Sequence, residues 1–143
     1  MSGDFTHETL GPFQRDARFA DLYRGEARWC GREVKLVLSD EVGPLEDAAA
    51  HAQSLLEKAI LWDAELRERI HESYYSIWNE SWREDEAELG KAEWMARFSF
   101  ESLDCHADGQ FTAWFKDGDL FWGHQMEVMG SIDGGVERVT MMG

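Results

Sequence analysis

The C-terminal third of the chain holds the side chains best suited to chemistry: Asp117, Asp119 and His124, followed by Glu127. Carboxylates beside an imidazole can bind a divalent cation or share general acid and base work. One hypothesis is therefore a metal-binding or hydrolytic enzyme that uses His124 with these nearby carboxylates.

The expected backbone geometry weakens that hypothesis. Residues 120–132 have the composition of one long strand, in which every second side chain shares a face. Asp117 and Asp119 belong to the turn before this strand, roughly 16 Å or more from His124 along an extended chain. We therefore favour turn carboxylates plus a half-buried histidine held by hydrogen bonds, since buried polar groups are usually satisfied structurally. His124 should then share a face with Leu120, Trp122, Met126 and Val128.

Cys105 and His106 have the residue types of a nucleophile and its base. Adjacent residues of a strand point to opposite faces, so the pair is badly placed to exchange a proton. Cys105 should share its face with Leu103 and pack in the core, where unactivated thiols are common.

Two acid–histidine pairs lie at helical spacing, Asp47 with His51 and Glu68 with His71. A carboxylate-bridged metal site in a helix bundle needs two Glu-x-x-His motifs and two further inward glutamates. Both pairs fall at the edge of the apolar stripe, so local ion pairing on a solvated face explains them better. We assign no metal ligands and predict no cofactor.

Turn signals divide the C-terminal third into strands. Asp-Gly is a strong hairpin signal, because glycine adopts positive φ at little cost and aspartate tolerates the left-handed region. The pairs are Asp108-Gly109, Asp117-Gly118 and Asp133-Gly134. They predict a four-stranded meander over residues 100–106, 110–116, 120–132 and 136–142, with a bulge near Gly123 or Gly130 in the long third strand.

The N-terminal part alternates in the same way. Residues 1–9 are predicted to be a flexible tail, and Pro12 places a short strand over residues 11–14 at an edge. Apolar and charged residues then alternate over 23–29 and 34–38, and Cys30-Gly31 between them predicts a hairpin.

Helical periodicity occupies the middle of the chain. Pro44 suits the first turn of a helix, and an apolar stripe continues to about Trp78. Asp63 could cap a second helix, so a bend or break is expected after Trp62. A short third helix is predicted over residues 91–98.

These elements predict an α+β fold in a single domain over residues 10–143. Its antiparallel sheet is built from the N-terminal hairpin and the C-terminal four-stranded meander. Two to three helices are inserted between them and pack on one face.

Aromatic residues are expected on both faces of this sheet. Trp114 and Phe121 should point away from their neighbours on the helix-covered face, and Met129 joins the Phe121 side. A second face this apolar should be covered by the N-terminal hairpin or by residues 79–82; otherwise it is an interface. The candidate partner-binding residues are Trp114, Phe121, Trp82 and Met129.

Charge limits the classes of partner. The chain has 143 residues, 29 acidic against 14 basic, and a net charge of −15. Such a surface repels phosphate backbones and anionic membranes, so neither nucleic acid nor a membrane is expected. It would instead steer a basic protein toward the molecule. The two cysteines, a polar N-terminus and the lack of a long apolar run favour the cytoplasm.

A resemblance rests on the stretch 117–124, on the Met-Glu-Val-Met-Gly of residues 126–130 and on Asp133-Gly134. With Leu10-Gly11, the hairpin 29–38 and Asn79-Glu80-Ser81-Trp82, these residues resemble the bacterial family catalogued as domain of unknown function 2262. The resemblance extends from about Leu10 to Gly143. It implies bacterial origin and a compact α+β unit, and it transfers no catalytic residues.

The leading hypothesis is a non-enzymatic cytoplasmic protein-binding domain, immunity-like by analogy, that docks a basic protein. The alternatives are the enzyme or metal-binding protein built on His124, and a self-associating structural module that forms a homo-oligomer.

Overall fold

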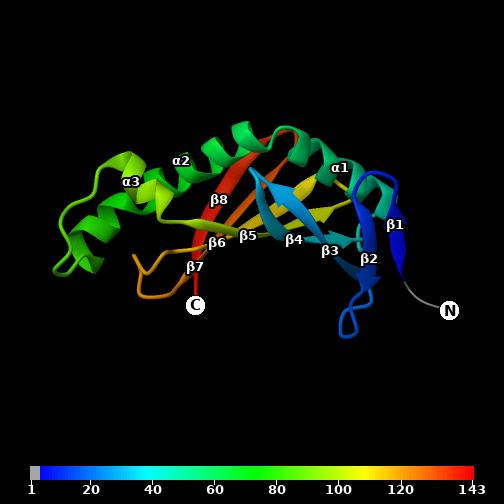
Figure 1. Cartoon of the computed structure of the whole chain (residues 1–143), viewed down its shortest axis with the longest axis horizontal. Coiled ribbons are helices and arrows are strands. Elements are labelled where there is room, and N and C mark those ends of the chain that lie inside the picture. The colour runs from blue at the N-terminus through cyan, green and yellow to red at the C-terminus, as the bar shows by residue number, and fades with distance from the viewer. Residues whose placement is uncertain (1–3) are drawn as a thin grey trace.

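The computed structural model describes residues 4–143 and shows four strands, a helical block and four more strands (Figure 1). The first strands are β1 (Phe5–His7), β2 (Gly11–Arg15), β3 (Leu22–Trp29) and β4 (Arg32–Ser39). The helical block contains α1 (Leu45–Glu57), α2 (Ala59–Ile77), the π-helical turn η1 (Trp78–Trp82) and α3 (Lys91–Ala96). The last strands are β5 (Ser99–His106), β6 (Gln110–Lys116), β7 (Gln125–Ser131) and β8 (Gly135–Met142).

The sheet follows chain order from β1 to β8, which confirms the α+β class. One feature differs from the antiparallel sheet that the sequence predicted: β4 and β5 are parallel, with Leu36 opposite Leu103. Parallel neighbours need a long crossover connection, and the helical block between Ser39 and Ser99 provides it. The two halves of the predicted fold therefore meet along a parallel pair.

The N-terminal strands follow their alternation and turn chemistry. Cys30 (φ 50°) and Gly31 (φ 83°) both lie in the left-handed region, as the tight turn between β3 and β4 requires. Within the stretch predicted as a tail, residues 1–3 lie outside the described residues and Phe5–His7 forms β1 against β2. The Nδ1 atom of His7 accepts hydrogen bonds from the backbone N–H groups of Thr9 and Leu10 and so closes the β1–β2 turn.

The helical layer begins after Pro44, as predicted, but its break lies at Lys58 rather than after Trp62. Lys58 leaves the helical region (φ −117°, ψ 31°) and separates α1 from α2. Asp63 therefore does not cap a helix. Its carboxylate accepts hydrogen bonds from the Trp29 indole at 2.9 Å and from Arg67 Nε at 2.8 Å, which ties β3 to α2.

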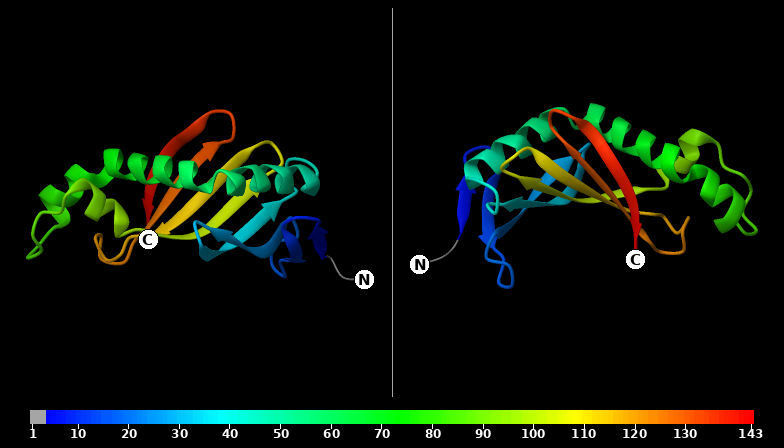
Figure 2. Two further views of the ribbon diagram at one scale, coloured as in Figure 1. Left: turned by 45° about the horizontal axis from the view of Figure 1, so that its top comes forward. Right: turned by 180° about the vertical axis from the view of Figure 1, so that it is seen from behind.

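Helices α1 and α2 lie across one face of the sheet, and α3 packs beside the far end of α2 (Figure 2). Ala48, Ala49 and Ala52 of α1 are fully buried, and small side chains of this kind let the helix approach the sheet closely. The facing strands contribute one buried row across the sheet, formed by Leu36, Leu103, Ala113 and Val128.

Side chains of α2 form hydrogen bonds with backbone groups along the outer edge of β8. Arg69 Nη1 donates to the carbonyl oxygen of Val136 at 2.8 Å, and the Val136 N–H donates to Glu65 Oε2 at 3.3 Å. Farther along, the Met141 N–H donates to the Tyr74 hydroxyl at 3.0 Å. An open strand edge is a template for pairing with another chain, so these contacts protect the edge.

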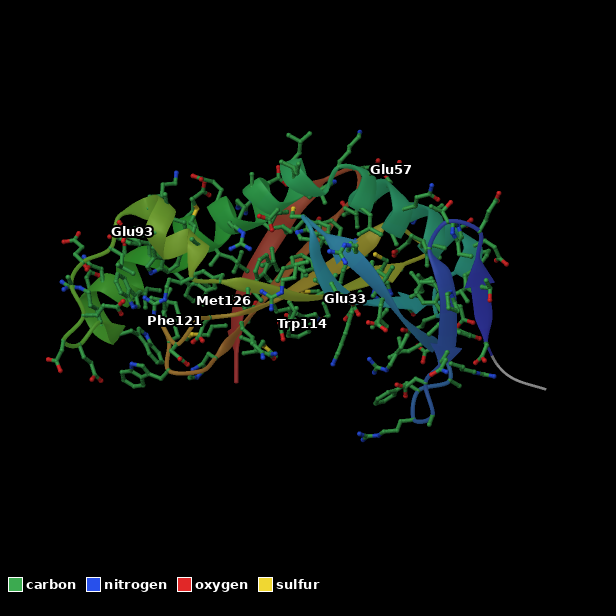
Figure 3. All side chains as sticks on the ribbon, viewed as in Figure 1. Glu33, Glu57, Glu93, Trp114, Phe121 and Met126 are labelled. Carbon is green, nitrogen blue, oxygen red and sulfur yellow. The ribbon has the colours of Figure 1, made fainter. Side chains whose placement is uncertain are left out.

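The opposite face of the sheet is more polar than the sequence predicted. Neither expected cover lies over it: Phe13 of β2 packs on Gly25 from the helix side, and residues 79–82 pack elsewhere. Trp114 lies on this face (Figure 3), where its indole N–H donates to Asp104 at 3.1 Å. Its two central rows are Arg24, Val37, Asp104, Thr112, Met129 and Arg138, then Glu26, Lys35, Ser102, Trp114, Glu127 and Thr140.

Candidate functional site

The segment 117–124 forms a folded loop between β6 and β7 instead of the hairpin and long strand that the sequence predicted. β7 begins only at Gln125. The bulge predicted in this strand is a register shift beside Gly130, and its extra residue, Glu137, lies on β8. Four residues of the loop have positive φ: Gly118 (59°), Asp119 (67°), Trp122 (60°) and Gly123 (94°). For a bulky exposed residue such as Trp122, this conformation costs on the order of 1–3 kcal/mol and persists only where surrounding contacts hold it.

The carboxylate of Asp117 supplies those contacts. It is 2% exposed and lies inside the loop. Oδ1 accepts the N–H of Asp119 at 2.9 Å, and Oδ2 accepts the N–H groups of Phe121, Gly123 and His124 at 2.9, 3.1 and 2.9 Å. Asp117 is thus a structural residue: its hydrogen bonds stabilise a loop of eight residues, 117–124, where the Asp-Gly pair predicted a tight hairpin turn.

The loop brings together side chains that an extended strand would have kept apart. A cleft of about 440 Å³, the His124 cleft, has both Asp119 and His124 in its wall. The predicted separation from the histidine was wrong for Asp117, whose Oδ2 accepts the His124 N–H. Glu127 lies outside this wall, on β7 opposite Trp114 and Thr140. The remaining lining residues are Ser99, Lys116, Asp117, Gly118, Gly123, Gln125, Met142 and Gly143.

The chemistry available in the His124 cleft is limited. The ring nitrogen Nδ1 of His124 lies in hydrogen-bond contact with the carbonyl oxygen of Phe121, which can only accept, so Nδ1 donates this hydrogen bond. The Asp117 carboxylate is occupied by four backbone donors. Within residues 4–143, no three His, Cys, Asp or Glu side chains come together in an arrangement that could hold a metal ion. Of the carboxylates and imidazoles in the wall, His124 and the exposed Asp119 remain.

Aromatic rings form a cluster on the other side of the same loop. The ring of Trp82, from η1, lies 4.6 Å from Trp122 at 58°, 5.4 Å from Phe121 and 5.5 Å from His124, as measured between centroids. Phe121 is fully buried in the core (Figure 3), so the prediction that it anchors a partner was wrong. Trp122 takes that exposed position, with 61% of its surface accessible.

A second, smaller cleft of about 210 Å³, the Trp82–Trp122 cleft, opens beside these indoles. Glu84, Asp85 and Asp119 are exposed on its rim. Arg83 is engaged within the molecule, with Nε donating to Asn79 at 2.8 Å and Nη1 to the carbonyl oxygen of Glu86 at 3.0 Å. The lining residues are Trp78, Trp82, Arg83, Glu84, Asp85, Glu86, Asp119, Leu120 and Trp122.

The remaining candidate residues have structural surroundings. Cys105 is buried in the core, and desolvation raises the pKa of its thiol, which keeps it protonated. The ring of His51 contacts the carbonyl oxygen of His106 at 3.2 Å. His71 stacks on Tyr75 at 4.7 Å, and burial lowers the pKa of its imidazole. Met129 lies half-buried on the open sheet face, where Arg138 Nη2 contacts its sulfur at 2.9 Å.

Sequence reasoning missed Trp122 because a strand assignment over 120–132 placed it on the face of His124. A local signal was available. Leu120, Phe121 and Trp122 are three consecutive large apolar residues, and an alternating strand cannot turn all three to one side. A glycine follows them directly, which is typical of a turn.

None of the helices in residues 4–143 is both long and apolar enough to span a membrane.

Comparison with known proteins identifies a family and no further relatives. Searches of curated proteins and of solved structures found no match to the chain. One family model, described as an uncharacterized protein conserved in bacteria, matches residues 7–141, nearly the whole chain. The chain therefore belongs to the bacterial family of domain of unknown function 2262, as the motifs in its sequence predicted.

Proposed function

We propose that this protein is a non-enzymatic binding domain that docks a basic protein on an acidic–aromatic surface formed by Trp82, Trp122, Glu84, Asp85 and Asp119. The observation that carries the proposal is the exposed Trp122 indole, held at φ 60° against Trp82. The strained backbone at Trp122 holds its indole in solvent, and burial of that apolar ring against a partner would be favourable.

Charge and aromatic contact would act at different stages of docking. The net charge of −15 would raise the rate of encounter with a basic protein. Tryptophan is enriched among the few residues that dominate the binding free energy of interfaces. Trp122 would therefore supply most of the affinity, while Glu84, Asp85 and Asp119 would supply orientation.

Two observations favour docking over the alternatives. The enzyme hypothesis needs several groups converging on one reacting atom, and the Asp117 carboxylate is already occupied by four backbone N–H groups. Self-association through the sheet is opposed by the contacts of α2 along β8 and by mutual repulsion of the acidic surfaces. An immunity-like role, a homo-oligomeric state and a cytoplasmic location stay predictions.

Site-specific photocrosslinking tests the proposal. A benzoylphenylalanine at position 122 is compared with the same residue at Ile60, an exposed apolar position (78%) on α2. In a native bacterial lysate, we expect position 122 to capture a basic protein that position 60 does not, with yield falling as salt rises.

Identical captures at both positions, or a single-chain mass by light scattering with no captured protein, would refute the docking function. The variant Trp122→Ala should release the same partner in a pull-down, whereas Ile60→Ala should retain it.

A further inference from the structure

The Trp82–Trp122 cleft has the dimensions of a receptor for one side chain. Its volume of about 210 Å³ lies below the roughly 300–1,000 Å³ of pockets that hold drug-sized ligands or cofactors. Two indoles form one wall, and their rings are inclined at 58° rather than stacked, so they do not cover each other fully. An inserted group could therefore contact an aromatic face.

Of the residues that the structure describes, more acidic than basic side chains line the cleft: Arg83 is its one cation, and its guanidinium is hydrogen-bonded to Asn79 and to the carbonyl oxygen of Glu86. Among the ion pairs formed within residues 4–143, Glu86 binds Arg97 at 2.5 Å, whereas Glu84, Asp85 and Asp119 take part in none. Such carboxylates beside an aromatic wall favour a cation over a neutral or anionic group.

The cations of the molecule contact other rings. In the described part of the chain, the guanidinium of Arg67 lies 5.3 Å from the Phe115 ring and that of Arg18 lies 5.5 Å from Phe19. Neither pair involves the indoles of Trp82 or Trp122, and indole is the ring that attracts cations most strongly. The preferred aromatic partner for a cation is thus open to a ligand.

We infer that this cleft binds the guanidinium group of an arginine presented on the surface of a partner protein. The inference rests on the proposed docking function and names its anchor residue. A guanidinium is planar and weakly hydrated, so it stacks on an indole while its N–H groups bind carboxylates in a fork geometry. A lysine ammonium is a compact, strongly hydrated charge and uses the aromatic wall less well.

Short peptides separate these chemistries. The probe is a blocked Gly-Arg-Gly peptide, compared with the same peptide carrying lysine, neutral citrulline or glutamate. Binding is followed through the NMR shifts of the Trp82 and Trp122 indole N–H groups. The arginine peptide should bind most tightly, the lysine peptide more weakly, and the other two without saturable shifts.

Variants of the wall and rim provide the second arm. Trp122→Ala should weaken binding of the arginine peptide about five- to tenfold. The triple variant Glu84→Gln, Asp85→Asn, Asp119→Asn should weaken it by a similar factor without removing an aromatic side chain. The matched control Glu46→Gln, Asp47→Asn changes exposed carboxylates at the start of α1 and should leave it unchanged.

Equal affinity for the arginine and citrulline peptides, or equal affinity in the triple variant and the control, would overturn the guanidinium assignment. Crosslinking at position 122 keeps the two proposals apart. A basic protein captured there without arginine-peptide binding would leave the docking function in place and refute arginine as its anchor.

Discussion

Asp117 and His124 are joined twice across the loop between β6 and β7. Oδ2 of Asp117 accepts the backbone N–H of His124 at 2.9 Å, and the backbone N–H of Asp117 donates to the carbonyl oxygen of His124 at 3.2 Å. This closure turns Leu120 and Phe121 into the core and leaves Trp122 outside. One buried carboxylate therefore shapes both clefts and presents the exposed indole.

Replacement of that carboxylate should loosen the loop. In Asp117→Asn the amide keeps one acceptor, weakens the charge-assisted hydrogen bonds and presents an NH₂ group to a backbone donor. We expect a loss of about 2–4 kcal/mol in the free energy of unfolding, measured by urea denaturation. The control Asp108→Asn changes an exposed turn residue that accepts only the Gln110 N–H at 3.1 Å, and it should cost about 0.5 kcal/mol or less. Equal losses in the two variants would contradict the structural role of Asp117.

Two glycines of the same loop should respond differently to alanine. A Cβ on Gly118 would lie 2.3 Å from the carbonyl oxygen of Arg97, while a Cβ on Gly123 would meet nothing within 4 Å. Both positions have positive φ, which costs alanine about 1–2 kcal/mol. Gly118→Ala should therefore lose about 2–4 kcal/mol, because a backbone clash is added, and Gly123→Ala only the smaller amount. Thermal denaturation of both variants would refute this account if Gly123→Ala proved the less stable.

Asp104 should give a stability change that depends on pH. Desolvation raises the pKa of this carboxyl above 3.8, although the hydrogen bond from Trp114 opposes the shift. The folded state therefore binds the proton more tightly than the unfolded chain, and ionisation at neutral pH costs stability. Asp104→Asn removes that cost and keeps an acceptor for the indole, so it should be more stable than the wild type at pH 7. The advantage should shrink as the pH falls through the raised pKa toward 3.8, as measured by urea denaturation across the range.

Asp16 should show the opposite dependence of stability on pH, because the pKa of its carboxyl is lowered rather than raised. The hydrogen bond from Arg24, together with the backbone N–H groups of Phe19 and Arg18, lowers the pKa of its carboxyl to about 2. The resulting stabilisation is present above 3.8 and is lost as the pH falls toward 2. Asp16→Asn should therefore be less stable than the wild type at pH 7 and approach it in acid. Parallel pH curves for the Asp16 and Asp104 variants would contradict both assignments.

Removal of one hydroxyl should expose the edge of β8. Tyr74→Phe keeps the aromatic ring, which lies 5.9 Å from Phe121, but leaves the Met141 N–H without its acceptor. We expect faster amide hydrogen exchange at Met141 and a loss of about 1 kcal/mol. Tyr75→Phe is the matched control, because its hydroxyl donates to the carbonyl oxygen of Leu89 instead. Unchanged exchange at Met141 in Tyr74→Phe would show that solvent serves the edge equally well.

The parts of the fold that follow local rules could be predicted from the sequence. Alternation over residues 23–29 and 34–38, with Cys30-Gly31 between them, is sufficient for the β3–β4 hairpin. Pro44 marks the start of α1 because proline fits the first turn of a helix. Asp117-Gly118 and Asp133-Gly134 are the same dipeptide, yet the first begins the folded loop 117–124 and the second lies in the short turn between β7 and β8. The dipeptide alone does not determine which of the two structures forms.

The loop 117–124 could not be predicted from turn chemistry because its organising interaction lies inside the molecule. Asp117 accepts N–H groups up to seven residues ahead, in a loop whose Leu120 and Phe121 are buried in the core. The predicted positions of the site residues were wrong for the same reason, because they assumed a strand over residues 120–132. Trp82, a predicted partner-binding residue, lies beside the loop. Phe121 is buried where exposure was predicted, and Trp122 is the exposed residue.

The parallel pairing of β4 with β5 has a consequence for how the chain folds. The hairpin β3–β4 and the meander β5–β8 are built from neighbours in sequence, and each can form by closing short loops. Contacts such as Leu36 with Leu103 form only after the whole helical block has brought distant segments together. Because non-local contacts slow folding, we expect this seam to form last and to set the folding rate. The hairpin and the meander would therefore form first, and pairing of β4 with β5 would then join them into one continuous core.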